Sequence, residues 1–245
     1  MGRPAFLLYG VIAYTIFLAT FLYLIAFVGD LPGMPRTVDR GGPEGSLGAA
    51  VAVNVALIAL FGLQHSVMAR QGFKAAWTRI VPKPIERSTY VVLASLALIL
   101  MFAFWRPIPT VVWEVEGAAA LLLWALFALG WVIVLLSTFL INHFELFGLR
   151  QVWTNMRGAA IPEPKFRQPL FYKLVRHPLY SGFFIGFWAT PQMTVGHLLL
   201  AAGVSVYMLI AISYEERDLI GLFGRDYEDY RNRVGMLTPR LRRRD

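Results

Sequence analysis

The chain of 245 residues contains no cysteine and few charged residues, and both absences restrict its function. Without cysteine it has no disulfide, no thiolate nucleophile and no cysteine-ligated metal. Charged residues make up 16% of the sequence and hydrophobic residues 57%, whereas a soluble domain carries about 25% charged residues. The apolar residues form long blocks and not amphipathic stripes, which indicates an integral membrane protein.

The sequence also lacks the features of several other protein classes. It has no internal repeat, no low-complexity tract, no GxGxxG pattern and no P-loop. The net charge of +8 would suit nucleic acid, but the basic residues lie between apolar blocks and in the tail Arg240 to Arg244. Basic residues placed in this way set the orientation of a membrane protein in the bilayer. We therefore expect membrane lipid as a partner, with the tail touching anionic headgroups, and infer neither a nucleic-acid partner nor an obligate protein partner.

Long apolar segments predict an all-α polytopic membrane protein with about six transmembrane helices. The first four spans run roughly over residues 6–28, 47–69, 88–105 and 117–141. A helix needs about 20 residues to cross about 30 Å of hydrocarbon, so the third span is short. Residues 179–214 contain no Asp, Glu, Lys or Arg, and as one helix they would reach about 54 Å. Because Pro191 and Gly196 interrupt them, we expect spans five and six to form a tight helical hairpin.

The distribution of lysine and arginine predicts the orientation of the chain. Residues 70–87 and 150–176 are rich in both, whereas the loop 29–46 carries only Arg36 and Arg40. The positive-inside rule places both termini and the two basic segments in the cytoplasm, with six crossings of a bacterial inner membrane. No linker interrupts the sequence, so we expect one domain over residues 1–245.

Three histidines lie at the predicted cytoplasmic ends of spans. His65 ends span two, His143 ends span four and His177 opens span five. Ionisable residues at membrane depth are costly and often functional, although each histidine could instead be an interfacial residue solvated by water or headgroups. Together with Glu145 they could ligate zinc. No pair has the spacing of an HExxH helix, so we expect no metal.

Two polar clusters bracket the uncharged segment near the C-terminus. Pro178 suits the first turn of a helix, and Gly182 and Gly186 permit close approach of a neighbouring helix or of a ligand. Glu215 and Glu216 are expected to close span six, where their charges oppose the helix dipole. A cation must then compensate them, and it could be an arginine or a cationic ligand.

The order of these motifs resembles the isoprenylcysteine carboxyl methyltransferase superfamily. The shared pattern is Arg-His-Pro-x-Tyr-x-Gly, an apolar hairpin, Glu-Glu-x-x-Leu and Phe-Gly-x-x-Tyr-x-x-Tyr, which stands here at residues 176–182, 215–219 and 223–230. Residues 63–70, 81–90 and 142–151 resemble the methanethiol S-methyltransferase branch, whose neighbours are the NnrU-like proteins. The resemblance covers nearly the whole chain. It implies methyl transfer from S-adenosylmethionine to a small thiol, methanethiol, giving dimethyl sulfide.

The resemblance also implies which residues form the site. Residues 146–245 would bind the cofactor and residues 1–145 would form the substrate side. The cofactor-binding residues would be Arg176, His177, Leu179, Tyr180, Gly182, Glu215, Glu216 and Leu219. A thiol becomes a strong nucleophile when a base removes its proton, and His65 and His143 are the candidate bases. Glu145 or Glu86 would orient the imidazole.

Other functions fit parts of the same pattern. A prenylcysteine carboxyl or phospholipid methyltransferase of the same superfamily would need a lateral opening for its lipid acceptor. An NADPH-dependent membrane reductase would need a phosphate-clamping cluster, for which Arg150, Arg157 and Arg176 are candidates. A transporter or assembly factor would carry ionisable residues at mid-membrane, whereas those here collect at one predicted face.

Overall fold

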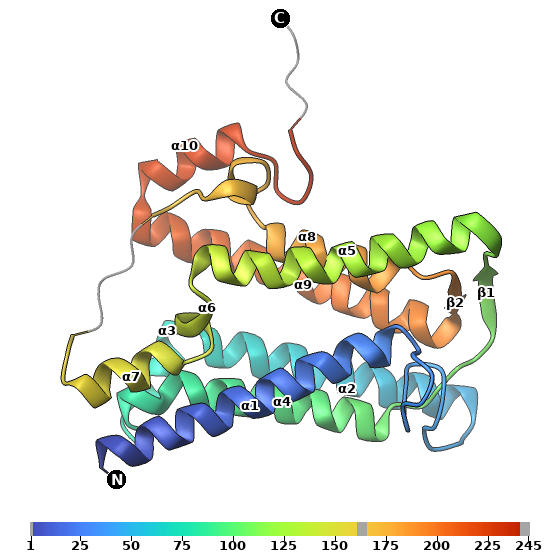
Figure 1. Ribbon diagram of the computed structural model, residues 1–245, viewed down its shortest axis with the longest axis horizontal. Coiled ribbons are helices and arrows are strands. Elements are labelled where there is room, and N and C mark those ends of the chain that lie inside the picture. The colour runs from blue at the N-terminus through green and yellow to red at the C-terminus, as the bar shows by residue number, and fades with distance from the viewer. Residues whose placement is uncertain (1, 161–165, 241–245) are drawn as a thin grey trace, which may run out of the picture. The chain divides into compact units, whose positions relative to one another are not determined.

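The secondary structure in the computed structural model is almost entirely helical (Figure 1). The structure describes residues 2–160 and 166–240, so the predicted lipid contact of the arginine-rich tail lies largely outside the described residues. The elements, in chain order, are α1 (Arg3–Val28), α2 (Leu47–Ala69), α3 (Gln71–Trp77), α4 (Lys83–Phe104), β1 (Val111–Glu114), α5 (Gly117–Ile141), α6 (His143–Leu146), α7 (Leu149–Arg157), the 3-10 helix η1 (Leu170–Lys173), α8 (Pro178–Trp188), β2 (Gln192–Thr194), α9 (Val195–Phe223) and α10 (Arg225–Arg233).

Among the described residues, five helices are long and apolar enough to cross a membrane: α1, α2, α4, α5 and α9. The chain is therefore an integral membrane protein with an all-α fold. The predicted bounds of the second and fourth spans are confirmed at both ends. The predicted short third span is wrong, because α4 has 22 residues and begins at Lys83. The prediction began the span after the last charged residue, Arg87, but the helix starts earlier and includes Glu86 and Arg87 in its N-terminal turns.

The C-terminal apolar segment differs from its prediction in two respects. The helix α8 has 11 residues and α9 has 29, so the predicted count of six spanning helices is not confirmed. The chain breaks between them as expected, but three of the connecting residues form β2, which pairs antiparallel with β1. Glu215 and Glu216 do not end a helix, since α9 continues to Phe223. The expected clash with the helix dipole is therefore wrong.

The chain divides into two compact units, each of which is described by itself. Unit 1 comprises Met1–Val115, Phe144–Pro162 and Gln192–Val204, and unit 2 comprises Glu116–His143, Glu163–Pro191 and Ser205–Asp245. The helix α9 thus begins in unit 1 and ends in unit 2.

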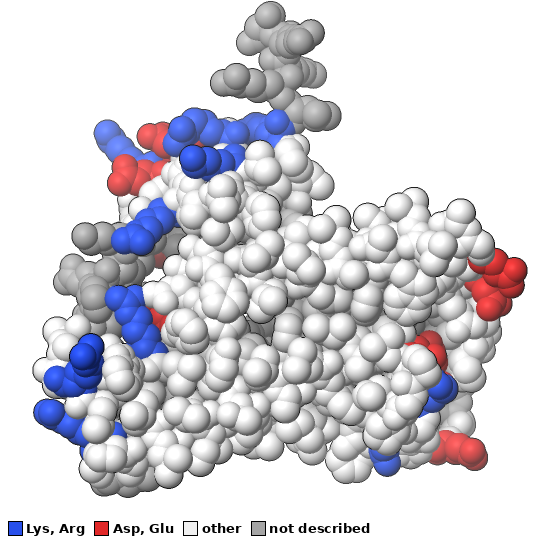
Figure 2. Space-filling model, in the orientation of Figure 1, with Lys and Arg blue, Asp and Glu red and all other residues white. Residues whose placement is uncertain are grey.

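Unit 1 is built on packing of α4 against α1 and α2, with α7 lying on α1. The fully buried Val152 of α7 fills the space left by Gly10 of α1. At the far end of α4, the buried Asn54 donates to the Arg106 carbonyl at 2.8 Å and accepts from the Arg106 amide at 2.9 Å. In the view of Figure 2, the surface along α1 and α4 is uncharged, and Lys and Arg gather at the end where α7 lies.

Unit 2 is built on a close contact between α5 and α8, which three glycines make possible. A Cβ on Gly130 would lie 2.6 Å from the Gly186 nitrogen and 2.8 Å from the Gly182 oxygen. A Cβ on Gly182 would lie 2.9 Å from the Val134 nitrogen. The two backbones therefore touch along a side-chain-free glycine seam (Gly130, Gly182 and Gly186). The α8 end of unit 2 is also tied to α9, because Trp188 Nε1 donates to Ser205 Oγ at 2.9 Å.

Candidate functional site

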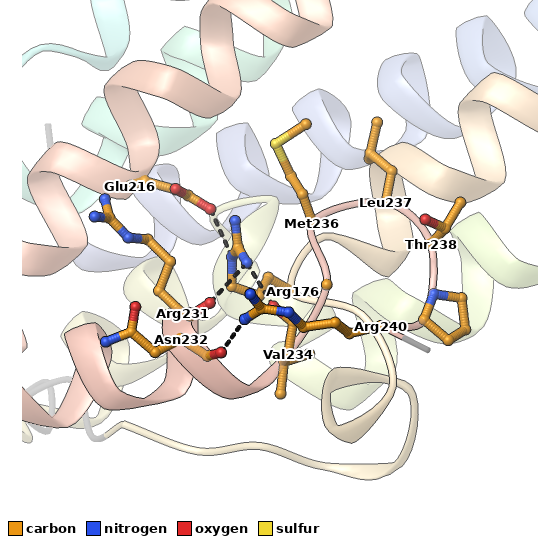
Figure 3. A pocket seen from close by; sticks show the side chains of 11 residues that line it. Arg176, Glu216, Arg231, Asn232, Val234, Met236, Leu237, Thr238 and Arg240 are labelled. Atoms are coloured by element: carbon orange, nitrogen blue, oxygen red, sulfur yellow. Dashed lines mark hydrogen bonds and ion pairs between the residues drawn. The ribbon is translucent and has the colours of Figure 1, made fainter. Parts of the chain in front are cut away.

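A pocket of about 610 Å³ lies in unit 2, at the polar end of α8 (Figure 3). This volume is in the range of sites for small organic ligands. Its walls come from three segments of the chain: the residues just before α8, the C-terminal part of α9, and the chain at and after the end of α10. The lining residues are Arg176, Glu216, Arg231, Asn232 and all seven residues from Val234 to Arg240.

Arg176 joins these walls through both its side chain and its backbone. Its Nε donates to Glu216 Oε1 at 2.7 Å, and its guanidinium also donates to the Val234 carbonyl at 2.5 Å and the Arg231 carbonyl at 3.1 Å. The arginine and glutamate side chains are only 10% and 12% exposed. An ion pair this sheltered is held by hydrogen bonds on several sides, so the arginine has one geometry.

His177 adds a second contact to the same carboxylate oxygen. Its Nε2 lies 3.1 Å from Glu216 Oε1, and its Nδ1 lies 4.0 Å from Glu215 Oε2. The histidine is buried, and its ring stands edge-on to that of Tyr180 with centroids 5.7 Å apart. Glu216 thus meets two nitrogen groups, while the Glu215 side chain stays 47% exposed and open to a ligand.

The segment 234–240, which follows α10, is fastened to the chain entering α8. The amides of Arg176 and His177 donate to the carbonyls of Gly235 and Met236 at 2.8 and 3.1 Å. Ser181 Oγ donates to the Leu237 carbonyl at 2.7 Å. The beginning of α8 therefore provides donors for this segment, and the segment closes the pocket.

Three tyrosines lie beside the charged groups of the pocket. Burial raises the pKa of Tyr230 to about 12, with Arg176 opposing and Glu216 reinforcing the shift. Burial and nearby Glu215 raise the pKa of Tyr172, and burial and Glu216 raise that of Tyr227. All three phenols therefore stay protonated at neutral pH. Tyr230 donates to the Tyr172 carbonyl at 2.6 Å, whereas the buried Tyr227 hydroxyl has no hydrogen-bond partner within residues 2–160 and 166–240.

The glycine seam fixes which end of α5 lies beside this cluster. Gly186 faces Gly130, and Gly182 faces Val134, so the two helices run antiparallel. One turn further along α5 is Thr138, and one turn back along α8 is Pro178, the first residue of that helix. The C-terminal end of α5, with His143 just beyond it, therefore lies at the same end of the helix pair as His177.

His143 is buried in unit 2, against a threonine hydroxyl and a phenylalanine ring. Its Nδ1 lies 2.8 Å from Thr138 Oγ1, and its ring stacks on Phe139 with centroids 4.2 Å apart and an interplanar angle of 4°. Burial lowers the pKa of His143, so the imidazole is neutral at pH 7.

The other two predicted catalytic residues lie in unit 1. The half-buried ring of His65 lies beside Phe61 and Tyr90, with centroid distances of 5.3 and 5.0 Å, and its carbonyl accepts from the Tyr90 hydroxyl at 3.3 Å. The Glu145 carboxylate forms an ion pair with Arg150 at 2.5 Å. That carboxylate therefore has an arginine partner, and its expected role in orienting an imidazole stays a prediction.

The structure brings together most of the predicted cofactor residues, whereas three of them lie outside the cluster. Arg176, His177, Tyr180, Glu215 and Glu216 form one cluster. Gly182 faces α5, which favours the helix-packing explanation for this glycine, and Leu179 and Leu219 are half-buried. Within the described residues, no group of three His, Asp or Glu side chains is placed to hold a metal ion.

Sequence reasoning missed the pocket wall at residues 231–240. Arg231, Asn232 and Arg240 provide polar groups there, and the Arg240 guanidinium donates to the Asn232 carbonyl. The arginines from Arg240 to Arg244 are a usable signal, but their pattern predicts only a tail that touches anionic headgroups. The proximity of this pocket wall to Arg176 depends on backbone hydrogen bonds, which no pattern of side chains predicts.

The site has the groups that an amino-acid-like ligand requires. Exposed Glu215 can pair with an ammonium or with hydroxyl groups, and Arg231 can pair with a carboxylate. The buried Tyr227 hydroxyl, within electrostatic reach of Glu215 and Glu216, is a donor without a partner among the described residues. Such a group is expected where a ligand supplies the missing acceptor.

Comparison with known proteins gives a consistent result along the whole chain. The chain is 54% identical over 240 residues to methanethiol S-methyltransferase of Mycobacterium tuberculosis, covering 98% of each protein. It is 51% identical over 243 residues to methanethiol S-methyltransferase of Pseudomonas deceptionensis, covering 99% of this chain and 92% of that protein. Human nurim is 30% identical over 210 residues, covering 77% of this chain and 78% of nurim. No family model and no solved structure matches the chain.

Proposed function

Since this chain belongs to the methanethiol S-methyltransferase family, we propose that it methylates methanethiol to dimethyl sulfide with S-adenosylmethionine as donor. The observation that carries the proposal is the cluster of Arg176, His177 and Glu216 at a pocket of about 610 Å³ in a chain that is at least 50% identical to such enzymes over nearly its whole length. The cluster lies in the motifs on which the family resemblance rests.

The pocket and the residues around it fit the donor. Arg231, which lines the pocket, would hold the carboxylate. Glu215, next in sequence to the pocket residue Glu216, would hold the ammonium or the ribose hydroxyls, and the nearby Tyr227 would supply a donor hydroxyl. Bound S-adenosylmethionine supplies an electrophilic methyl group on a sulfonium. Arg176 and His177 would act through Glu216, whose carboxylate they hold in place, and Tyr180 would face the cationic ligand with its ring.

The residues at the end of α5 fit the second requirement, a base for the thiol. We assign proton acceptance to His143, because its buried imidazole is neutral and lies at the same end of the α5–α8 pair as His177. His65, whose ring lies between aromatic side chains, is the second candidate. Glu145, whose carboxylate pairs with Arg150, stays the candidate for orienting an imidazole that the family resemblance implies.

The apolar surroundings suit the reaction. Transfer of a methyl group from a sulfonium to a thiolate removes two opposite charges, so the transition state is less polar than the separated ions. A site that excludes water therefore lowers the barrier, provided that the polar groups still bind the donor. The ring of Phe139, stacked on His143, provides such an apolar surface.

We propose six crossings of a bacterial inner membrane with both termini in the cytoplasm. The fifth crossing would consist of α8, about 16 Å long at 1.5 Å per residue, followed by an extended stretch to β2. This stretch and α9 would form the expected hairpin, which the bond from Trp188 to Ser205 supports. The absence of cysteine allows a direct test. Glu44→Cys should react with an impermeant maleimide from outside intact cells, and Asp226→Cys only after lysis; the reverse pattern would invert the topology.

The activity is tested with purified protein, methyl-labelled donor and methanethiol. We expect labelled dimethyl sulfide in the headspace and S-adenosylhomocysteine in solution. Prenylcysteine and phosphatidylethanolamine serve as alternative acceptors in parallel reactions, and NADPH oxidation is followed for the reductase alternative. Absence of volatile sulfide together with methylation of a lipid acceptor would reject the thiol and keep the donor.

A further inference from the structure

We infer that Thr138 is a positioning residue that fixes His143 in the Nδ1–H tautomer, so that Nε2 accepts the proton of the thiol. The inference rests on the proposed function, because it assumes that His143 acts as the base. Neither the family motifs nor the sequence patterns above include Thr138, and its role follows from the contacts of one hydroxyl group.

The hydroxyl of Thr138 has two close oxygen or nitrogen neighbours and only one proton. Its Oγ1 lies 2.6 Å from the Leu135 carbonyl, which can only accept a hydrogen bond. The single hydroxyl proton therefore goes to Leu135. The same Oγ1 lies 2.8 Å from His143 Nδ1, so this second bond must be donated by the imidazole.

A neutral imidazole carries one proton. When Nδ1 holds it and donates it to Thr138, the lone pair is on Nε2. Burial favours the neutral imidazole, and stacking on Phe139 fixes the plane of the ring. The tautomer and the ring plane together determine the direction in which the basic nitrogen points.

The place of this pair in the fold agrees with the role. Thr138 lies one turn beyond the glycine seam, level with Pro178, which follows His177. The chemical step is then simple. The S–H bond of the thiol breaks, and its proton passes to His143 Nε2 and later to solvent. The electron pair left on the sulfur would form the new bond to the methyl group, while the methyl–sulfonium bond of the donor would break and leave its electron pair on the sulfur of S-adenosylhomocysteine.

The test compares Thr138→Val with Thr138→Ser, which keeps the hydroxyl. A matched control is Thr20→Val in α1, because Thr20 is also buried and donates to a carbonyl four residues back, Ile16, at 2.8 Å. Thr138→Val should lower kcat about 10- to 100-fold, the range for groups that orient a functional histidine. Thr138→Ser and Thr20→Val should stay near wild type, and donor binding should not change in any of the three.

Two further measurements do not depend on the size of the activity loss. Nitrogen-15 NMR of histidine-labelled protein should show Nδ1–H for His143, assigned by loss of its signal in His143→Gln, and a shift toward the other tautomer in Thr138→Val. With only four histidines in the chain the spectrum is tractable. In a His143→Ala background, Thr138→Val should cause no further loss of turnover.

The outcomes separate the inference from the proposed function. An Nε2–H tautomer in the wild type, or a Thr138→Val variant that retains normal turnover, would overturn the inference and leave methyl transfer standing. Normal turnover in His143→Ala would also overturn it. If the wild type methylated no thiol at all, the proposed function would fail and the base role inferred for His143 would fail with it, whatever tautomer the spectrum showed.

Discussion

His177 and His143 lie at the same end of the α5–α8 pair but in opposite chemical environments. His177 lies between two carboxylates, 3.1 Å from one and 4.0 Å from the other, next to Arg176. His143 lies against a threonine hydroxyl and a phenylalanine ring. Charged neighbours make the first histidine part of a binding site for a charged molecule, whereas burial keeps the second histidine unprotonated and basic.

The comparison separates two tasks that one family motif does not distinguish. A sulfonium ligand with ammonium and carboxylate groups needs countercharges held in fixed positions. A thiol needs a neutral base in a place that water does not fill. The same helix pair provides both, because the glycine seam sets α5 and α8 side by side and each helix contributes one histidine at that end.

The largest expected effect comes from removing the neutral histidine. His143→Ala should lower turnover about 100- to 10,000-fold, the range for a lost general base. Donor affinity should be unchanged, because the charged cluster stays intact. Steady-state release of dimethyl sulfide, together with calorimetry of donor binding, measures both. If His65→Ala instead causes the large loss while His143→Ala turns over normally, the base has been assigned to the wrong histidine.

The site around His177, Arg176 and Glu216 should respond in the opposite way, with a loss of donor binding. Glu216→Gln removes the carboxylate that Arg176 and His177 share, and loss of a charged hydrogen bond costs about 1.5–3 kcal/mol. The dissociation constant for S-adenosylmethionine should therefore rise about 10- to 100-fold in calorimetry. Glu228→Gln, an exposed glutamate in α10, is the control. Unchanged donor binding in Glu216→Gln would remove this cluster from the cofactor site.

The seam that holds the two sites together gives an effect on stability. In Gly130→Ala the new Cβ would meet backbone atoms of α8 at 2.6 and 2.8 Å, and overpacking costs about 1–3 kcal/mol. Gly221→Ala, at a helical glycine of α9 with nothing within 4 Å, should stabilise by about 0.5–1 kcal/mol. Unfolding in mixed detergent micelles measures both. Equal stability of the two variants would contradict the close packing of α5 on α8.

The last effect is a dependence of stability on pH, and it concerns a carboxylate that lies near Asp30 and Arg40. Burial raises the pKa of Asp39 to about 6, although the Thr194 hydroxyl donates to it at 2.5 Å. The folded state then holds a proton that the unfolded state releases near pH 4, so stability should fall as pH rises from about 4 to 6 and level off above. Thermal unfolding across this range should show the slope. Asp39→Asn should abolish it and Glu44→Gln, an exposed residue of the same loop, should keep it.

The long helices could be predicted because hydrocarbon imposes a length and a composition on them. The bounds of α2 and α5 agree with the sequence, since charged or turn-forming residues stand at both ends. Ends that hydrogen bonds govern, and not hydropathy, could not be predicted. The extension of α4 and α9 past their apolar parts and the strand β2 are the examples.

The part of the candidate site that consists of characteristic side chains could be predicted. The cluster of Arg176, His177 and Glu216 follows the family motifs. The wall at residues 234–240 could not be predicted, because backbone amides and carbonyls hold it in place, and these occur at every residue. Thr138 was missed for a different reason. A threonine in an apolar span is ordinary, and only the position of its oxygen distinguishes it from the others.

The glycine seam has a consequence for anyone who would redesign the enzyme. A random library should yield inactive clones at Gly130 and Gly182, since one added methyl group would change the spacing between the two histidine sites. In a screen, these inactive clones would have no obvious connection with the binding site or the base. Selection for a bulkier acceptor should therefore recover its gains from the helix ends and leave the middle of the α5–α8 pair unaltered.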